Sequence, residues 1–529
     1  MALELTLAAQ RRLVEVLLDP SRHPHPAPAV TLIETHISFL LLTGPFAYKI
    51  KKAVDLGFVD YTRLERRHFF CQEELRLNGR LAPRLYLDVV PIAGSPEDPR
   101  LGGAGEPVEF AVRMAQFDQD RLLDRLIARG ELTADHVDAL AATVAAFHGS
   151  APPAAPADDY GSPAAVWAPV AANFAHLRAK AGSDAWPLLE RLEGWSRAEF
   201  QRLGEKVARR KAEGFVRECH GDLHLGNVAL LEEEPTIFDC IEFNPELRWI
   251  DVINDLAFLV MDLAERGRPD YAWRLLNDWL EVRGDYGGLA LLRFYQAYRA
   301  LVRAKVAAIR AADPASSPAD REGAKAGLAA YLAFAEGITA PKPPLLLVTH
   351  GLSGSGKTLL ARRAAEALGA IRLRSDVERK RLQGLQPLAR SGSGIACGLY
   401  ADSATVATYR RLAELAAEVI AAGYPAIVDA ACLARWQRDS FRDLARDLKV
   451  PFLILHCRAP CSVLEKRVAA RARLGRDASE ADLAVLTRQC RDVEPLAADE
   501  LDLALTVDTD KDGPEAALER LRQRIIPAP

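Results

Sequence analysis

The pattern of apolar and polar positions over residues 1–340 predicts a strand-rich segment followed by helices. Alternation with a period of two indicates half-buried strands, and recurrence every three or four residues indicates amphipathic helices. Strands are expected within 30–51 (a hairpin or meander), 85–90, 108–117, 228–231 and 236–239. Helices are expected at 4–18, 64–77, 120–148, 163–212 and 270–336. The Gly- and Pro-rich stretch 94–106 is expected to be a solvent loop, and 151–157 a linker inside the domain.

A different pattern begins after a proline-rich boundary. Residues 341–344 contain three prolines, which cannot continue a helix. From Leu345 onward, short apolar runs at 345–349, 427–428 and 452–456 alternate with helical patterns, which predicts an α/β domain with a central parallel sheet. The expected organisation is a domain at 1–340, a linker at 341–344 and a second domain at 345–529.

Composition and charge narrow the class of protein without identifying its function. The 529 residues are 49% apolar and 26% charged, as in ordinary globular proteins. A net charge of -4 creates no field that would attract nucleic acid or an anionic membrane. The chain has no secretory signal pattern, no apolar run of about eighteen residues and no zinc-site cysteine spacing. We expect a cytoplasmic protein without a nucleic-acid or membrane partner, and its oligomeric state stays open.

A phosphate-binding motif opens the second domain. The run from Gly351 to Thr358 matches G-x-x-x-x-G-K-[ST] and lies between a predicted strand and a predicted helix at 359–368. Glycines let backbone N–H groups surround phosphates at a helix N-terminus, Lys357 would reach the β- and γ-phosphates, and the Thr358 hydroxyl would bind Mg²⁺. The expected nucleotide contacts are Gly351, Ser353, Gly354, Ser355, Gly356, Lys357 and Thr358. The alternative is a Gly/Ser-rich loop that precedes a helix by chance.

Two acids and two arginines of the second domain are further candidates. Asp376 and Asp429 follow predicted strands, where ligands bind in open α/β sheets. Asp376 is a candidate general base, and Asp429 a candidate contact for Mg²⁺ or substrate, whereas the alternative for each is a helix N-cap. Arg467 and Arg471 share a face of a predicted helix and would neutralise charge on the γ-phosphate. A solvated basic helix face is the alternative for this pair.

The order of these motifs resembles that of small-molecule P-loop kinases of the gluconate kinase-like and zeta-toxin-like kind. After the P-loop come Ser375-Asp376, then Val428-Asp429-Ala430, then Leu464-x-x-Arg467-x-x-x-Arg471. The resemblance covers 345–529 and implies an ATP-binding domain that transfers phosphate, without naming the acceptor.

A second constellation lies in the first domain, where the run His220 to Asn227 reads His-Gly-Asp-Leu-His-Leu-Gly-Asn. An Asp, an Asn five residues later and Asp239 twelve residues after that form the set that phosphoryl transfer needs. Asp222 would orient the acceptor hydroxyl, and Asn227 and Asp239 would hold Mg²⁺ against the phosphates. A polar β-turn is the alternative.

This run resembles the motif of the aminoglycoside phosphotransferase and choline kinase superfamily. The resemblance implies a bilobal, protein-kinase-like α+β fold, with Asp222 as the catalytic base and Asn227 and Asp239 as metal ligands. Asp255 matches a structural aspartate of that family. The wider sequence, including Glu34-Thr-His-Ile-Ser and Phe238 to Asn244, is similar to a bacterial group in which this domain is fused to a P-loop kinase.

The strand lysine of the first site is left open by the sequence. Ala47-x-Lys49 has the pattern of the lysine that pairs with the α/β-phosphates, but Lys51 lies on the same strand face. Its helix partner would be one of Glu65, Glu73 and Glu74. The first hairpin has only Gly44 near its turn and lacks G-x-G-x-x-G, which disfavours a protein kinase more than a small-molecule kinase.

The leading hypothesis is therefore an ATP- and Mg²⁺-dependent phosphotransferase with two kinase-type sites. The acceptor would be a hydroxyl group of a small molecule such as a sugar, amino sugar or aminoglycoside. The alternative is one catalytic domain with a regulatory nucleotide-binding module. A kinase acting on a macromolecule is disfavoured, because no activation segment ending in Ala-Pro-Glu follows Asp239 and no basic stripe suits nucleic acid.

Overall fold

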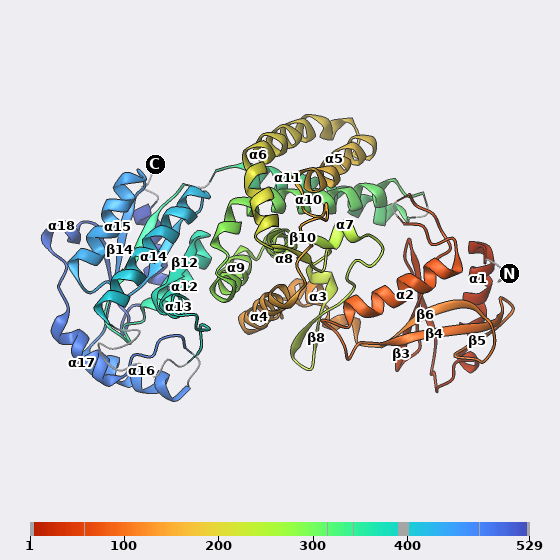
Figure 1. Ribbon diagram of the computed structural model, residues 1–529, viewed down its shortest axis with the longest axis horizontal. Coiled ribbons are helices and arrows are strands. Elements are labelled where there is room, and N and C mark those ends of the chain that lie inside the picture. The colour runs from red at the N-terminus through yellow and green to blue at the C-terminus, as the bar shows by residue number, and fades with distance from the viewer. Residues whose placement is uncertain are drawn as a thin grey trace. The chain divides into compact units, whose positions relative to one another are not determined.

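The computed structural model describes residues 5–525 except 58, 315, 342, 390–400 and 475–476. The chain divides into two compact units. The first consists of Met1–Ala139, Ser150–Ala171 and Gly204–Leu259, and the second of Leu140–Gly149, Ala172–Leu203 and Val260–Pro529. The elements of both units are labelled in Figure 1. Among the described residues, no helix combines the length and the apolar character that a membrane span requires.

The first unit begins with a six-stranded antiparallel sheet in the order β1-β2-β3-β6-β4-β5. Its strands are β1 (Thr31–Glu34), β2 (Ser38–Leu42), β3 (Phe46–Lys51), β4 (Tyr86–Ser95), β5 (Asp98–Leu101) and β6 (Pro107–Ala115). Because side chains alternate along a strand, Tyr48 and Ile50 of β3 join the core under helix α1 (Leu7–Val16). Ala47 faces the other core, which helix α2 (Leu64–Asn78) covers. Lys49 and Lys51 share that second face.

The expected solvent loop at 94–106 is wrong in its first part. Strand β4 continues to Ser95 and forms a hairpin with β5, in which Ser95 pairs with Asp98. Gly94 makes this close turn practicable, since its φ is +97° and an added Cβ would stand 2.3 Å from the Asp98 carbonyl oxygen. The glycine that suggested a loop instead permits a tight approach of two strands.

The rest of the first unit contains two small two-stranded antiparallel sheets. β7 (Val216–Glu218) pairs with β10 (Trp249–Asp251), and β8 (Val228–Leu231) pairs with β9 (Glu234–Ile237). The segment 151–157, expected to be a linker, forms a bridge through Pro153 to Arg217. Helix α3 (Leu123–Ala128) contacts β8, and α8 (Val252–Glu265) begins directly after β10.

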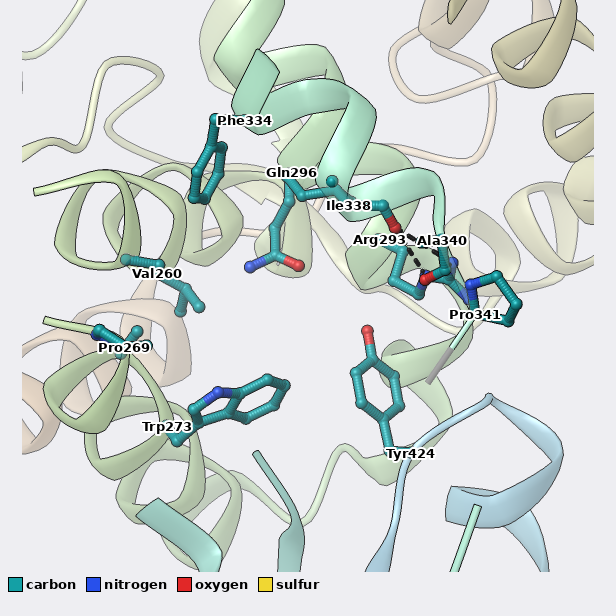
Figure 2. Close-up of a pocket in the computed structure, with 13 residues that line it drawn as sticks. Val260, Pro269, Trp273, Arg293, Gln296, Phe334, Ile338, Ala340, Pro341 and Tyr424 are labelled. Atoms are coloured by element: carbon teal, nitrogen blue, oxygen red, sulfur yellow. Dashed lines mark hydrogen bonds between the residues drawn. The ribbon is translucent and has the colours of Figure 1, made fainter. Parts of the chain in front are cut away.

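The helices of the second unit include α4 (Ala134–Ser150), α6 (Trp186–Ala212), α9 (Pro269–Arg283), α10 (Leu289–Ala312) and α11 (Pro318–Thr339). Helices α4, α5 (Pro163–Lys180) and α6 are each divided between the first and the second unit. At the end of α11, Arg293 donates hydrogen bonds to the carbonyl oxygens of Ile338 at 3.0 Å and Ala340 at 2.9 Å (Figure 2). The last carbonyls of a helix lack intrahelical partners, so this guanidinium completes the helix end just before the proline-rich boundary.

The second unit also contains a five-stranded parallel sheet in the order β12-β13-β11-β14-β15. Its strands are β11 (Leu346–His350), β12 (Ile371–Arg374), β13 (Ala426–Asp429), β14 (Phe452–Arg458) and β15 (Ala504–Asp508). The helices around it are α12 (Lys357–Leu368), α13 (Ser375–Arg381), α14 (Asp402–Ala421), α15 (Arg435–Asp447), α16 (Cys461–Leu474), α17 (Leu483–Asp492), α18 (Ala498–Leu501) and α19 (Pro514–Ile525). The expected parallel α/β arrangement is confirmed, and β15 was not predicted.

Helix α9 packs directly on this sheet domain. It contacts α12 and β12, and ion pairs join Arg274 to Glu366 at 3.0 Å and Asp278 to Arg362 at 2.6 Å. The compact units therefore divide the chain differently from the domains predicted on either side of 341–344. The domain boundary at 341–344 stays a prediction from the sequence. Helices that precede it and helices that follow it pack within the same compact unit.

Candidate active sites

The two lysines of β3 have different surroundings in the first unit. Lys49 Nζ lies 2.7 Å from Glu74 Oε1 and 2.7 Å from Asp239 Oδ1. Lys51 Nζ lies 2.7 Å from Glu74 Oε2 and also pairs with Glu242. The Lys51 side chain is fully buried, whereas that of Lys49 is 16% exposed and lines a cavity. Lys49 is thus the lysine that faces the cavity, and Lys51 anchors the helix glutamate, which is Glu74.

Electrostatics keep this cluster charged. Burial alone would raise the pKa of Glu74, but Lys49 and Lys51 lower it to about 2. Burial would likewise lower the pKa of Lys49, and the carboxylates of Asp239 and Glu74 raise it well above the usual value. A carboxylate between two ammonium groups holds both lysines in place at neutral pH.

The cavity beside Lys49 has a volume of about 150 Å³. Asp239 and Phe238 lie on one side, and Ala47, Tyr86 and Met114 are among its other walls. Mostly apolar walls with a lysine and an aspartate at one end suit a flat ring attached to a charged group.

Next to Asp239 lies the loop that carries the His-Gly-Asp motif. Asn227 Nδ2 donates to the backbone oxygen of Asp222 at 2.9 Å and to its Oδ2 at 3.1 Å. His224 Nε2 lies 3.4 Å from the same carboxylate oxygen, and the Asp222 side chain is 37% exposed. Since the amide nitrogen of Asn227 is engaged by Asp222, its amide oxygen is the atom left to face a metal ion.

The other motif residues shape this loop. The buried carboxylate of Asp255 accepts hydrogen bonds from the backbone N–H groups of His220 at 3.1 Å and Gly221 at 2.9 Å. Gly221 has φ +89°, and an added Cβ would stand 2.7 Å from the Leu247 carbonyl oxygen. His220 Nε2 lies 2.8 Å from the Phe238 carbonyl oxygen, so the histidine ties the loop to the segment that carries Asp239. His220 and Gly221 therefore have structural tasks in shaping this loop.

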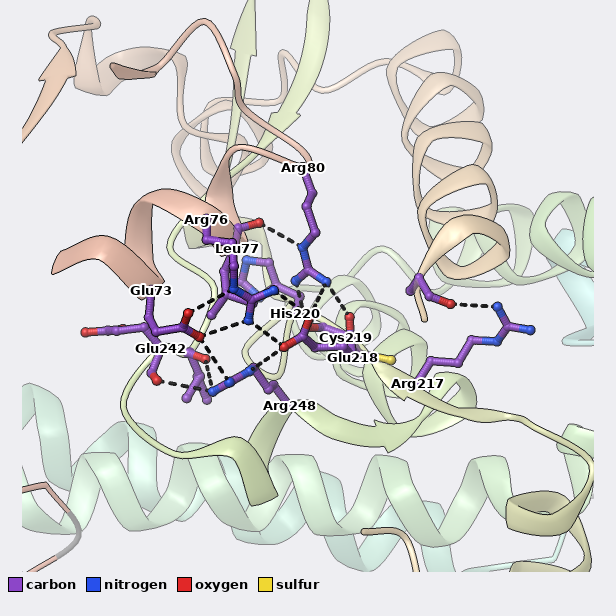
Figure 3. Close-up of polar contacts among 12 residues, drawn as sticks. Glu73, Arg76, Leu77, Arg80, Arg217, Glu218, Cys219, His220, Glu242 and Arg248 are labelled. Atoms are coloured by element: carbon purple, nitrogen blue, oxygen red, sulfur yellow. Dashed lines mark hydrogen bonds and ion pairs between the residues drawn. The ribbon is translucent and has the colours of Figure 1, made fainter. Parts of the chain in front are cut away.

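Three arginines surround Glu218 immediately before the loop (Figure 3). Arg76 lies 2.7 Å from Glu218 Oε1, Arg80 lies 3.2 Å from Oε2 and Arg248 lies 3.2 Å from Oε1. Burial would raise the pKa of Glu218, but these arginines lower it. Arg76 belongs to α2, which also carries Glu74, so one helix contacts both the lysines of β3 and the glutamate that precedes the His-Gly-Asp loop. Sequence analysis missed this cluster, because no local spacing marks it.

The predicted P-loop lies between β11 and α12 in the second unit. A Cβ added to Gly351 would stand 2.4 Å from the carbonyl oxygen of Cys457. A Cβ added to Gly354 would stand 2.8 Å from the carbonyl oxygen of Leu464. Only glycine fits these close approaches, and within the loop the Ser353 N–H donates to Gln489 Oε1 at 2.8 Å. Lys357 Nζ donates to the Leu352 carbonyl oxygen at 3.3 Å and so bends back over the loop.

The structure brings Asp429 to the P-loop threonine. Strand β13 neighbours β11, and Thr358 Oγ1 donates to Asp429 Oδ1 at 3.2 Å. Asp429 is buried, and its Oδ2 has no hydrogen-bond partner among the described residues, with Arg374 Nε 3.7 Å away. Burial raises the pKa of Asp429 and Arg374 offsets part of that shift. A hydroxyl oxygen and an orphaned carboxylate oxygen fit the oxygen ligands that Mg²⁺ prefers.

The helix N-cap alternatives are wrong for both acids. Asp429 ends β13, and the next helix begins only at Arg435. Asp376 is the second residue of α13, where Arg374 occupies the N-cap position. Asp376 is half-buried and adds to the negative potential that raises the pKa of Asp429. Both aspartates therefore lie at the ends of adjacent parallel strands, as ligand-binding residues of such sheets do.

The two arginines of α16 differ. Arg467 donates to the Gly354 carbonyl oxygen at 3.3 Å and to Thr509 Oγ1 at 2.8 Å, so it holds the P-loop against the end of β15. A solvated basic face is wrong for this residue. Arg471 instead donates to the Ala481 carbonyl oxygen at 3.0 Å. Thr509, which also donates to the Ser355 carbonyl oxygen at 2.9 Å, was not found from the sequence.

Known proteins with similar sequences share both halves of this arrangement. A family model described as "Phosphotransferase enzyme family" matches residues 65–295, and one described as "AAA domain" matches 346–496. The uncharacterized protein Rv2004c of Mycobacterium tuberculosis is 31% identical over 476 residues, which cover 89% of this chain and 93% of the relative.

Two solved kinases show partial similarity. A sugar kinase from Janibacter sp. is 25% identical, with a TM-score of 0.27, and the match covers 35% of this chain and 97% of that one. The amicoumacin kinase hAmiN, in complex with AMP-PNP and Ca²⁺, is 14% identical, with a TM-score of 0.40 and coverage of 62% and 92%.

Proposed function

We propose that this chain phosphorylates a hydroxyl group of a small molecule. The premise is that it belongs to one family with Rv2004c and joins a phosphotransferase-family domain to a P-loop kinase domain. The chain is a kinase, and kinases of these families use ATP and Mg²⁺. The proposal extends that activity to two working sites and to a small hydroxyl acceptor such as a sugar, amino sugar or aminoglycoside.

The observation that carries the proposal is that Lys49 pairs with Asp239 at one end of a cavity, while the loop with Asp222 and Asn227 is tied through His220 to the segment that carries Asp239. Lys49 binds the phosphates of ATP, and Asn227 and Asp239 would hold Mg²⁺, which neutralises phosphate charge when bound. Asp222, partly exposed and oriented by Asn227, accepts the proton of the acceptor hydroxyl.

In the second site, the P-loop N–H groups and Lys357 bind the phosphates, and Thr358 and Asp429 would hold Mg²⁺. Asp376, at the end of the adjacent strand, is proposed as the general base. Arg467 keeps the loop in shape through Gly354 and Thr509. Arg471 is proposed to approach the γ-phosphate if α16 moves.

The test is ATP-dependent phosphate incorporation across a panel of sugars, amino sugars and aminoglycosides. Asp222→Asn keeps the size of the side chain but removes the base, and Lys357→Ala removes the P-loop ammonium. If each substitution abolishes a different acceptor-dependent activity, both sites are catalytic. Loss of one shared activity in both variants would show that the sites act in series.

A regulatory P-loop domain is the competing outcome. It would leave all transfer intact in Lys357→Ala while Asp222→Asn abolishes it. Unchanged transfer in both variants would refute the proposal.

A further inference from the structure

A cavity of about 380 Å³ lies in the second unit and shares no lining residue with either candidate active site. Helices α8 to α11 supply most of its wall, and Tyr424, just before β13, closes one side (Figure 2). Small-molecule sites have volumes of about 300–1,000 Å³, so this cavity is large enough for a ligand of one or two rings.

Two buried polar side chains point into the cavity. The Tyr424 residue is 2% exposed, and its hydroxyl has no hydrogen-bond partner among the described residues. Figure 2 shows this hydroxyl directed into the open space, with the amide of Gln296 entering from another side. Gln296 is 8% exposed and offers both a donor and an acceptor. Buried polar groups in folded proteins are nearly always hydrogen-bonded, so an unpaired hydroxyl in a cavity indicates a partner that enters it.

Aromatic rings and the charge of the wall restrict that partner. Trp273 meets Tyr424 edge to face, with ring centroids 5.8 Å apart, and Phe334 lies across the cavity. Arg293 is the charged residue of the lining, and its guanidinium already donates to three carbonyls at the end of α11. Among the described lining residues there is no carboxylate, so a cation would lose its hydration without gaining a counter-charge from them.

We propose that this cavity binds an uncharged small molecule that carries a ring and one carboxamide-like polar edge. Its ring packs against Trp273 and Phe334, its carbonyl oxygen accepts from the Tyr424 hydroxyl, and its N–H donates to Gln296. Tyr424 precedes the strand that ends at Asp429, so the ligand contacts both the helices and the P-loop domain.

Binding of 4-fluorobenzamide to the full-length chain, followed by ¹⁹F NMR line broadening, tests the proposal. We expect saturable binding that excess AMP-PNP with Mg²⁺ does not displace. Tyr424→Phe removes only the hydroxyl and should weaken binding about five-fold while the melting temperature stays equal or rises.

A second pair of variants separates the cavity from the rest of the surface. Gly337 lines the cavity, and Gly323 lies on the same helix outside the lining. At both positions an added Cβ would meet no atom within 4 Å. Gly337→Phe should abolish binding, and Gly323→Phe should preserve it. The proposal would be overturned if the wild type showed no saturable binding or if AMP-PNP displaced the ligand. It would also be overturned if Tyr424→Phe and Gly337→Phe both bound 4-fluorobenzamide as tightly as the wild type does.

Discussion

At the scale of single residues, the acids of the two sites have opposite environments. Asp222 is partly exposed and accepts a hydrogen bond from Asn227, whereas Asp429 is buried with one oxygen unpaired. An exposed acid exchanges protons readily with an acceptor, and a buried one gains most from a cation. The same residue type is thus set up for proton transfer in one place and for charge pairing in the other.

This contrast predicts the behaviour of Asp429→Asn. Burial raises the pKa of Asp429, so its ionised form destabilises the fold at neutral pH when no cation is present. The amide should therefore leave the melting temperature unchanged or raise it without Mg²⁺, yet weaken Mg²⁺-dependent nucleotide binding at the P-loop about ten-fold or more. Calorimetric titration with AMP-PNP, in a background of Asp239→Asn, measures the second effect. A lower melting temperature with intact Mg²⁺-dependent binding would contradict it.

At the scale of elements, α2 connects the parts of the first site. Its Glu74 holds both lysines of β3, and two residues later Arg76 pairs with Glu218, which precedes the loop of the His-Gly-Asp motif. A shift of this helix would move Lys49 and the loop of the His-Gly-Asp motif together. Removal of one partner from the buried Lys–Glu pairs would leave a buried charge uncompensated, which is strongly destabilising.

The pH dependence of Glu74→Gln follows from the lowered pKa. A fall from 4.5 to about 2 corresponds to about 3 kcal/mol of unfolding free energy, fully present above the unfolded-state pKa. The melting-temperature gap between wild type and Glu74→Gln should be constant from about pH 8 to about pH 5, and should narrow as the pH falls toward about 2. Glu65→Gln, at an exposed position on the same helix, is the control and should show no gap. A gap independent of pH would contradict this account.

At the scale of the whole molecule, packing joins what chain order separates. Glu281 at the end of α9 pairs with Arg372 and, at 3.3 Å, with Arg374 of β12, and Arg374 in turn approaches Asp429. Helices that precede the proline-rich boundary therefore support the strand beside the P-loop site. Each compact unit is held together by such contacts rather than by continuity of sequence.

This packing predicts that the P-loop ligand is sensed in α9. Binding of AMP-PNP with Mg²⁺ should slow amide hydrogen exchange in 269–283 as well as in α12, because the two helices share ion pairs. Lys357→Ala should remove this protection, and Glu281→Gln should reduce it in α9 alone. Protection confined to α12 in the wild type would show that the helices do not respond together.

Motifs whose residues are close in sequence were predictable for a physical reason. A P-loop needs glycines, a lysine and a hydroxyl at set spacings, and the run from Gly351 to Thr358 lies between β11 and α12 as expected. The same holds for Asp222 and Asn227, which lie in one loop and hydrogen-bond each other. Local backbone geometry determines these arrangements, so the sequence by itself determined the kinase class, the two folds and the residues of each motif.

Contacts between distant segments were decided only by the tertiary structure. Lys49 and Lys51 share a strand face, and the sequence could not choose between them, because burial under α2 distinguishes the two. Pairing in space likewise selected Glu74 over its neighbours and brought Thr509 to the P-loop. It also placed the unpaired Tyr424 hydroxyl in a cavity built from both sides of the proline-rich boundary. Sequence spacing encodes local geometry, whereas burial and long-range pairing depend on how complete elements pack.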